Sequence, residues 1–106
     1  MTVTDLAIPA DHPAYAGHFP GRPILPGVVI LDACLRELVA QCGRAPLRWR
    51  IAHAKFKSPV APGEALTLEF EGLPTGPVRL TVRASGRVVA MAEVSGVWSD
   101  EVPGGR

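Results

Sequence analysis

PGVVILDACLRELVAQCG, residues 26–43, is the stretch that decides the fold. Proline and glycine at its start suit the first positions of a helix, and the glycine at its end suits a C-terminal cap. Apart from Asp32, the first half is apolar on nearly every face, and further charges follow only at Arg36 and Glu37. Because a helix that is apolar all round has to be enclosed, the stretch predicts one long buried helix.

The segment ahead of this helix is crowded with proline and glycine. The chain holds 11 of each among its 106 residues, and seven of them lie at positions 13–27. Prolines at that density exclude a helix or a central strand. The apolar fraction of 47% is too high for a disordered chain, so we expect a stiff loop over residues 12–27.

Beyond the helix, apolar residues recur at every second position. The expected strands are residues 2–8, 47–51, 66–71, 78–83 and 88–94. Strict alternation predicts strands with one buried and one solvent-facing side, and Ser85-Gly86 is short enough for a tight hairpin turn. The fold class is therefore α+β, with an antiparallel sheet whose apolar face wraps the single helix.

The composition bounds the partners and the compartment. A net charge of +1 gives no electrostatic case for nucleic acid, and no apolar run is long enough to span a membrane. The N-terminus has no feature of a secretory signal. The two cysteines, Cys34 and Cys42, are too few for a disulfide scaffold and too far apart on one helix to bridge. We therefore expect a cytoplasmic protein.

The length predicts a single domain. We expect this domain to cover residues 1–100, followed by a disordered C-terminal tail at 101–106. A core of this size is marginal, because small domains bury a smaller share of their surface. Association with another chain is therefore expected.

Three residues are candidates for chemistry. Asp32 lies in the apolar half of the helix, where an ionised carboxylate is costly unless it faces outward or pairs with Arg36 one turn later. His18 lies in the stiff loop and is either a general base or an ordinary exposed histidine. Gly27 is either a plain turn glycine or a position where a ligand oxygen approaches free backbone N–H groups at the helix start. No pair of histidines and cysteines has the spacing of a metal site.

Two segments resemble a known family. GHFPGRPILPGVVILDACL, residues 17–35, is similar to the active-site segment of the hot-dog-fold 3-hydroxyacyl-ACP dehydratases of fatty acid synthesis. In that family a loop histidine precedes an acid on the central helix by 14 residues, a spacing that His18 and Asp32 match. AKFKSPVAPGEALTLEF, residues 54–70, is similar to a second family segment. The short form of this chain looks most like the small dehydratases of aryl-polyene and related pigment pathways.

The resemblance implies a hot-dog fold and the elimination of water from a 3-hydroxyacyl thioester, which gives the trans-2-enoyl thioester without metal or organic cofactor. It implies that His18 removes the α-proton and that the Gly27 N–H polarises the thioester carbonyl. It also implies that Asp32 holds or relays a proton for the leaving hydroxyl. The family's active sites combine the histidine and the acid of different protomers, which implies a homodimer.

The implied substrate is an acyl chain on the phosphopantetheine arm of an acyl carrier protein, although coenzyme A stays open as the thiol. The residues expected to bind the substrate are Phe19, Pro20, Ile24, Leu25, Val28, Arg36 and Phe56. The resemblance implies that the acyl chain lies in an apolar tunnel at the dimer interface. Arg22, Lys55 and Lys57 are candidates to receive the acidic carrier protein at the mouth of this tunnel, or are ordinary surface charge.

Two other functions stay open. A hot-dog thioesterase also uses a carboxylate on the central helix, but thioesterases generally lack the loop histidine. In the other open alternative, the chain is a non-catalytic subunit that forms a heterodimer with a second hot-dog protein. The motive for this reading is Arg36, which stands where the family often has glutamine and can hold Asp32 ionised.

Overall fold

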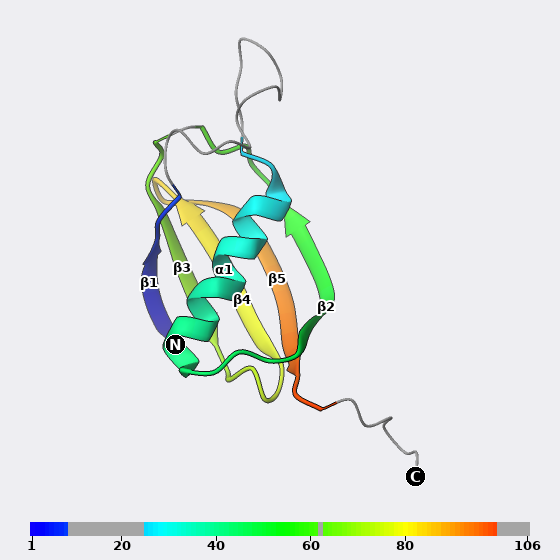
Figure 1. Ribbon diagram of the computed structural model, residues 1–106. Coiled ribbons are helices and arrows are strands. Elements are labelled where there is room, and N and C mark those ends of the chain that lie inside the picture. The colour runs from blue at the N-terminus through cyan, green and yellow to red at the C-terminus, as the bar shows by residue number, and fades with distance from the viewer. Residues whose placement is uncertain (9–24, 62, 100–106) are drawn as a thin grey trace.

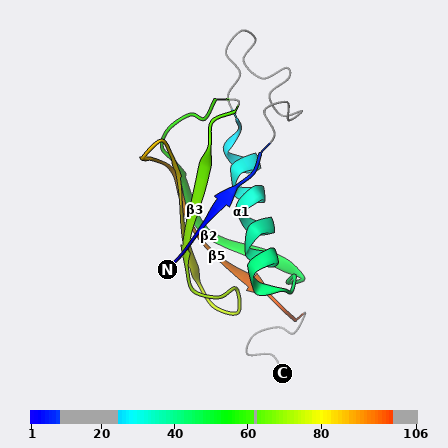
Figure 2. The same cartoon turned by 90° about the vertical axis from the view of Figure 1, so that its left-hand side faces the viewer.

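The computed structural model describes residues 1–8, 25–61 and 63–99, and these residues form one helix and five strands. The elements are β1 (Thr2–Leu6), α1 (Gly27–Cys42), β2 (Arg48–Phe56), β3 (Leu66–Glu71), β4 (Val78–Ala84) and β5 (Arg87–Val97). The helix lies along one face of the sheet (Figure 1), and the side view shows two layers (Figure 2). This is the predicted α+β arrangement, a hot-dog fold in which an antiparallel sheet wraps one helix.

The strand order explains why the helix lies across the sheet. The order is β1-β3-β4-β5-β2, and every neighbouring pair is antiparallel. The strands β1 and β2 therefore lie at opposite edges, and α1 connects them by crossing the sheet face. The remaining strands, β3 to β5, follow one another as a meander.

The predicted helix ends and hairpin turn are confirmed. Pro26 is the N-cap, and Gly43 adopts a left-handed conformation with a φ of 82° while its N–H donates to the Val39 carbonyl at 2.8 Å. Ser85 and Gly86 have φ angles of 50° and 81°, and two successive positive values are typical of a type I′ turn. These local signals are read correctly because each depends on backbone chemistry alone.

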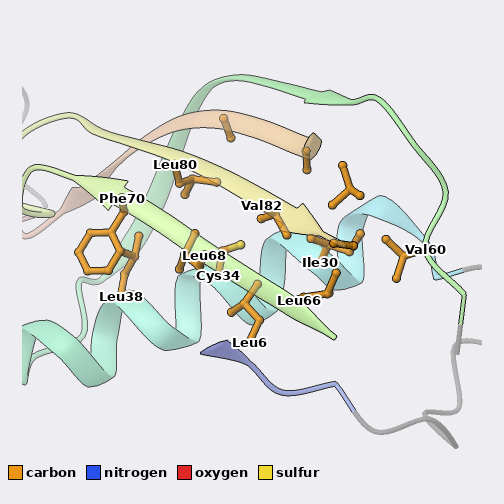
Figure 3. Close-up of a cluster of buried hydrophobic side chains, with 14 of the residues drawn as sticks. Leu6, Ile30, Cys34, Leu38, Val60, Leu66, Leu68, Phe70, Leu80 and Val82 are labelled. Atoms are coloured by element: carbon orange, nitrogen blue, oxygen red, sulfur yellow. The ribbon is translucent and has the colours of Figure 1, made fainter. Parts of the chain in front are cut away.

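The hydrophobic core lies between the sheet and one stripe of the helix (Figure 3). Ile30, Cys34 and Leu38 form this stripe at four-residue spacing and are the buried residues of α1. The sheet residues buried on the same side are Leu66, Leu68, Phe70, Val78, Leu80, Val82, Ala90, Ala92 and Val94. The alternation predicted for β3, for β4 and for residues 90–94 of β5 therefore faces the helix as expected. At the start of β5 a register shift opposite Val82 and Arg83 buries Val89 in place of Val88.

The prediction of a completely buried helix is wrong for the single chain. Val28 is 70% exposed, and Asp32 and Arg36 follow it on the same exposed stripe. One sheet covers only one face of a helix, and the sequence pattern does not say what covers the other. Apolar side chains on the open face therefore remain available to a second chain.

The second expected strand differs most from its prediction. It extends to Phe56, well beyond residue 51, and Leu47 and Ile51 are exposed. A register shift between Ile51 and His53 changes which side chains face the helix, so that Trp49 before it and Ala54 after it both pack against the core. The alternation of apolar residues stops at such a bulge, so the pattern predicts that the strand ends at residue 51 although it continues to Phe56.

Three further predictions concern the chain as a whole. Within the described ranges, no helix is long and apolar enough to cross a membrane. Cys34 and Cys42 are both free, as predicted. The expected tail at 101–106 lies outside the described residues, and the single-domain assignment of residues 1–100 stays a prediction.

Candidate active site

The helix start forms the centre of the candidate site. Pro26 has an extended backbone with φ −61° and ψ 143°, and no side chain caps the helix. Proline has no N–H, so Gly27 supplies the first backbone donor of α1. The first N–H groups of a helix have no partner within it and carry the positive end of the helix dipole. A carbonyl oxygen that develops negative charge is therefore stabilised at this position.

Phe56, at the end of β2, packs directly on Gly27. A Cβ atom at position 27 would lie 2.6 Å from the Phe56 Cδ1 atom, well inside van der Waals contact. The missing side chain thus makes room for the aromatic ring, whereas the sequence suggested that it makes room for a ligand. This correction concerns the side of Gly27 that lacks a Cβ and does not affect its backbone N–H. The role of that N–H as a donor to the substrate stays a prediction.

A cavity of about 350 Å³ opens beside this contact. Its lining residues are Leu25, Pro26, Gly27, Ile30, Phe56, Lys57, Ser58 and Pro59. The structure therefore brings together four residues that the sequence singled out, which are Leu25, Gly27, Phe56 and Lys57. Its wall is mainly apolar, as an acyl chain requires.

Sequence reasoning missed four lining residues of this cavity, which are Pro26, Ile30, Ser58 and Pro59. Ser58 and Pro59 fall within the segment 54–70 that resembles the family, so a signal existed, but the sequence analysis singles out only Lys55, Phe56 and Lys57 from it. Ile30 was assigned to the core, where it is also buried. A cavity is formed by segments that are distant in sequence, and no local pattern indicates which of them meet.

Asp32 does not reach this cavity in the single chain. It lies five residues after Gly27. At about 3.6 residues per turn, the two positions are therefore roughly 140° apart around the helix axis. Its side chain is 59% exposed and accepts a hydrogen bond from Arg36 Nε at 2.8 Å. The alternative that Asp32 faces outward and pairs with Arg36 is therefore confirmed, and the expectation of apolar surroundings is wrong within one chain.

Arg36 and Val28 lie on the same exposed stripe as Asp32. The hydrogen bond to Asp32, and then the attraction between their charges, raises the pKa of the Arg36 guanidinium. Neither Arg36 nor Val28 lines the cavity beside Gly27, so the substrate contacts expected of them are not formed within one chain. Positions 28, 32 and 36 repeat every four residues, which places them together on the face that the sheet leaves open.

Only one of the two candidate lysines lies at the cavity, because Lys55 lies within β2 and Lys57 follows the end of that strand. Lys57 lines the cavity, whereas Lys55 is exposed and pairs in register with Met91 of β5. Adjacent positions of a strand point to opposite faces, so Lys55 lies on the sheet face away from Phe56. Within one chain only Lys57 borders the cavity, and the carrier-protein contact expected of Lys55 stays a prediction.

Five predicted site residues lie outside the described residues. They are His18, Phe19, Pro20, Arg22 and Ile24. Their roles as base, substrate contacts and carrier-protein contact therefore stay predictions. Among the residues that the structure describes, no group of three or more histidine, cysteine or acidic side chains could hold a metal ion.

A second cavity, of about 250 Å³, lies on the outer face of the sheet. Its polar lining residues include His53, Glu69, Glu71 and Arg79. None of the residues that the sequence selected for catalysis lines it. The cavity beside Gly27 is therefore the better candidate for the active site.

One family model and two curated relatives that match this chain are described as dehydratases. The family described as ApeI-like, ApeI dehydratase, matches residues 1–93. The 3-hydroxyacyl-[acyl-carrier-protein] dehydratase FabZ of Protochlamydia amoebophila is 35% identical over 97 residues, covering 82% of this chain and 63% of the relative. The same enzyme of Chloroflexus aggregans is 37% identical over 93 residues, covering 76% of this chain and 65% of the relative. The chain thus spans less than two thirds of the length of these curated relatives.

A solved structure agrees with the fold. The dehydratase heterocomplex ApeI:P from Xenorhabdus doucetiae superposes with a TM-score of 0.68 at 25% identity, covering 88% of this chain and 83% of that chain. The similarity extends over nearly all of the described elements. It therefore supports the hot-dog fold that the sequence predicted.

Proposed function

Since the chain belongs to the ApeI-like dehydratase family, we propose that it removes water from a 3-hydroxyacyl thioester to give the trans-2-enoyl thioester. The observation that carries this proposal is the backbone donor of Gly27 beside a mainly apolar cavity. The donor suits a thioester carbonyl, and the apolar wall suits the acyl chain attached to it. Such a dehydration needs an acid and a base but neither a metal nor an organic cofactor.

Each chemical demand of the reaction has a candidate residue. The α-proton is weakly acidic, so the carbonyl has to be polarised while a base removes the proton. The Gly27 N–H polarises the carbonyl, and His18 accepts the α-proton. The 3-hydroxyl then leaves as water with a proton supplied through Asp32, while the electrons of the broken C–H bond form the new double bond.

A second protomer completes the site. Within one chain Asp32 lies on the open face of α1 and does not line the cavity beside Gly27. A second copy that covers this face brings its Asp32 toward the cavity of its partner, which agrees with the two-protomer sites implied by the resemblance. Exposed Val28 on α1 and Ile51 on the edge strand β2 supply apolar surface for such an association.

The substrate's thiol is the phosphopantetheine of an acyl carrier protein. The relatives from Protochlamydia amoebophila and Chloroflexus aggregans are described as acting on acyl-carrier-protein thioesters. Lys57 at the cavity is a suitable contact for an acidic carrier protein, and Arg22 and Lys55 extend the positive charge in sequence. Because Cys34 and Cys42 are free thiols, we place the reaction in the reducing cytoplasm.

A direct assay tests this function. The full chain is incubated with 3-hydroxyacyl carrier protein and, in parallel, with the coenzyme A thioester, and loss of one water is followed by mass spectrometry. We expect dehydration that His18→Ala and Asp32→Asn each reduce by at least about a hundredfold. Unchanged turnover in both variants would exclude the mechanism, and release of free acid and thiol would identify a thioesterase.

One observation favours a second candidate function. Arg36 Nε donates to the Asp32 carboxylate at 2.8 Å, so this side chain is already bound to a cation of its own chain. In this alternative the chain is the non-catalytic subunit of a heterodimer, and the similar structure from Xenorhabdus doucetiae is itself described as a heterocomplex. Activity of the purified chain alone supports the first function. Activity only after mixing with a second hot-dog chain encoded nearby supports the alternative.

A further inference from the structure

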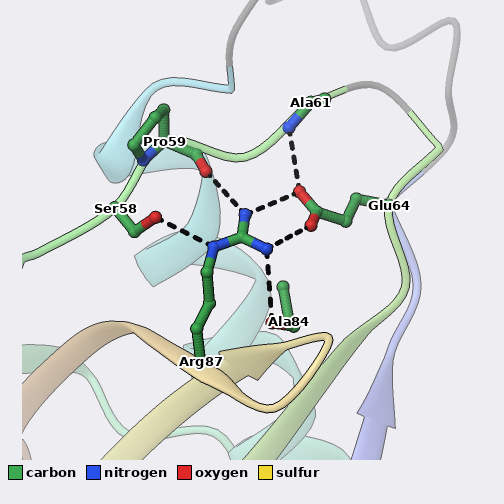
Figure 4. Close-up of polar contacts among 6 residues, drawn as sticks. All are labelled: Ser58, Pro59, Ala61, Glu64, Ala84 and Arg87. Carbon is green, nitrogen blue, oxygen red and sulfur yellow. Dashed lines mark hydrogen bonds and ion pairs between the residues drawn. The ribbon is translucent and has the colours of Figure 1, made fainter.

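Arg87, the first residue of β5, joins several parts of the chain through one guanidinium group (Figure 4). Its Nε donates to Ser58 Oγ at 2.9 Å, and one terminal nitrogen donates to the Pro59 carbonyl at 2.9 Å. The two terminal nitrogens also donate to the two carboxylate oxygens of Glu64, at 2.5 and 2.9 Å. A longer bond of 3.4 Å reaches the Ala84 carbonyl. The planar guanidinium therefore fixes the connection between β2 and β3 on the β4–β5 hairpin.

Glu64 is fixed in turn by this connection. Its Oε1 accepts a hydrogen bond from the Ala61 N–H at 3.2 Å, in addition to the bonds from Arg87. Hydrogen bonding to Arg87, followed by the bond to Ala61, lowers the pKa of the Glu64 carboxyl. The carboxylate is thus ionised at neutral pH and joins Ala61 to Arg87, which itself binds Ser58 and Pro59.

The same segment forms the wall of the candidate active site. Ser58 and Pro59 line the cavity beside Gly27. The next residue, Val60, is fully buried, and its carbonyl accepts a hydrogen bond from the Leu25 N–H at 2.9 Å. Leu25 is separated from Gly27 by Pro26 alone. A short series of contacts therefore leads from Arg87 to the first backbone donor of α1.

We propose that Arg87 and Glu64 are positioning residues of the dehydration site, which hold Ser58–Val60 and, through Val60, the Leu25–Gly27 segment in place. This inference rests on the proposed function. The two side chains need not contact the substrate; they fix the wall against which the thioester lies and the donor that receives its carbonyl. Displacing such groups by about 1 Å costs roughly a hundredfold in rate, because the orientation of the reacting atoms is lost.

The chain contains a matched control for this pair. Arg83 and Glu69 form a second arginine–glutamate contact, at 2.8 Å between Nε and Oε2, across β4 and β3. The exposed fractions are 39% and 22% in this pair, and 39% and 19% for Arg87 and Glu64. Neither Arg83 nor Glu69 lines the cavity beside Gly27. Exposed pairs of this kind contribute little to stability, so the two pairs should differ in activity and not in folding.

The first arm of the test is kinetic. Arg87→Lys keeps the positive charge but loses the planar fork, and Glu64→Gln keeps the size but loses one acceptor. We expect each to lower kcat by at least about tenfold while KM changes less than about threefold, because the lost alignment matters in the transition state. Arg83→Lys and Glu69→Gln should leave both constants within about twofold. Equal kinetic effects at both pairs would overturn the proposal.

The second arm does not depend on activity. Hydrogen exchange of the Leu25 amide, measured by NMR on the full chain, reports directly on its bond to Val60. We expect Arg87→Lys to accelerate this exchange at least about fivefold, as local opening becomes easier, and Arg83→Lys to leave it unchanged. Unchanged Leu25 exchange in Arg87→Lys would overturn the proposed positioning. If the wild-type chain shows no dehydratase activity, the proposed function is wrong. The hydrogen exchange of the Leu25 amide would still decide whether Arg87 holds Leu25 in place.

Discussion

The phenyl ring of Phe56 packs on the α-carbon of Gly27 so closely that a methyl group at position 27 would lie 2.6 Å from the ring. This contact joins the end of β2 to the start of α1, two segments separated by the whole helix in sequence. It ties the proposed oxyanion donor to an aromatic wall of the cavity. The consequence is that a larger residue at position 27 would have to displace the Phe56 ring.

The first prediction follows from this contact. Gly27→Ala should displace the Phe56 ring, which is 51% exposed and free to swing outward. We expect the free energy of unfolding to fall by about 1–3 kcal/mol, as for other overpacked sites. Turnover should fall by roughly a hundredfold, because the donor and the cavity wall shift together. Urea unfolding and the dehydration assay measure the two effects.

Another glycine supplies the control for this substitution. Gly76 lies in the turn before β4, and a Cβ atom there would have no neighbour within 4 Å. Gly76→Ala should therefore change the unfolding free energy by less than about 0.5 kcal/mol. The double variant Gly27→Ala/Phe56→Ala should lose less stability than the sum of the two single variants, because the contact is removed only once. Additive losses would show that the two residues are not in contact.

The second prediction concerns pH. Hydrogen bonding to Arg87 lowers the folded-state pKa of Glu64 below its ordinary value of 4.5. A carboxyl of this kind adds stability above its unfolded pKa, and that stability is lost as the pH falls through the folded value. At pH 7 the melting temperature of the wild type should therefore be higher than that of Glu64→Gln. The difference should be no more than about 5 °C, because such ion pairs are weak. The difference should shrink as the pH falls below 4.5.

A change of background tests the cause of this pH dependence. Arg87→Met removes the cation that lowers the pKa of Glu64, so the same Glu64→Gln substitution should lose its pH-dependent effect there. Calorimetry of the four proteins between pH 3 and pH 7, an interval of about four units around the ordinary carboxyl pKa, measures this. A melting difference that is constant with pH would show that ionised Glu64 does not bind Arg87.

The third prediction separates the two cysteines. Burial raises the pKa of the Cys34 thiol to about 12, because Cys34 lies on the buried stripe of α1 and is fully enclosed by the core. Cys42, at the end of the helix, is only partly buried. Because the thiolate is the reactive form, a thiol reagent at pH 8 should modify Cys42 in the native protein and leave Cys34 untouched.

Titration with a chromogenic disulfide counts the reactive thiols. One equivalent should react in buffer and two in about 6 M urea, where the core is exposed. Cys42→Ser should abolish the native reaction, and Cys34→Ala should preserve it. Modification of Cys34 in the native Cys42→Ser protein would mean that the helix opens far more easily than its packing indicates.

The sequence predicted most of the fold because its main signals are local. Gly43 as a left-handed cap and Ser85-Gly86 as a hairpin turn depend on backbone conformation, and the alternation in β3 and β4 depends on one buried face. The sequence overestimates the burial of α1. Apolar residues indicate that a helix face will be buried, but they do not indicate which element or which second chain packs on that face. Val28 remains open for that reason.

The candidate site was predicted in its residues more than in its geometry. Gly27, Leu25 and Phe56 meet at one cavity, as the resemblance implied. The outward position of Asp32 and its pairing with Arg36 match one of the two predicted alternatives. The residues that Asp32 approaches in the proposed dimer belong to a second copy, so the pattern of one chain does not indicate them. Arg87 was overlooked because its five contacts come from segments between 23 and 29 residues away, apart from Ala84 in its own hairpin.

The fourth prediction tests the two-protomer site by complementation. His18→Ala and Asp32→Asn are each expected to be inactive as pure proteins. When the two are co-expressed, random pairing makes half of the dimers mixed, and each mixed dimer contains one site with both native residues. The mixture should therefore recover about a quarter of the wild-type activity.

A chain carrying both substitutions, co-expressed with either single variant, should recover none, because no site then combines both residues. Absence of recovery in the first mixture, with dimers present by light scattering, would place His18 and Asp32 of one site in the same chain or assign the second residue to a different protein.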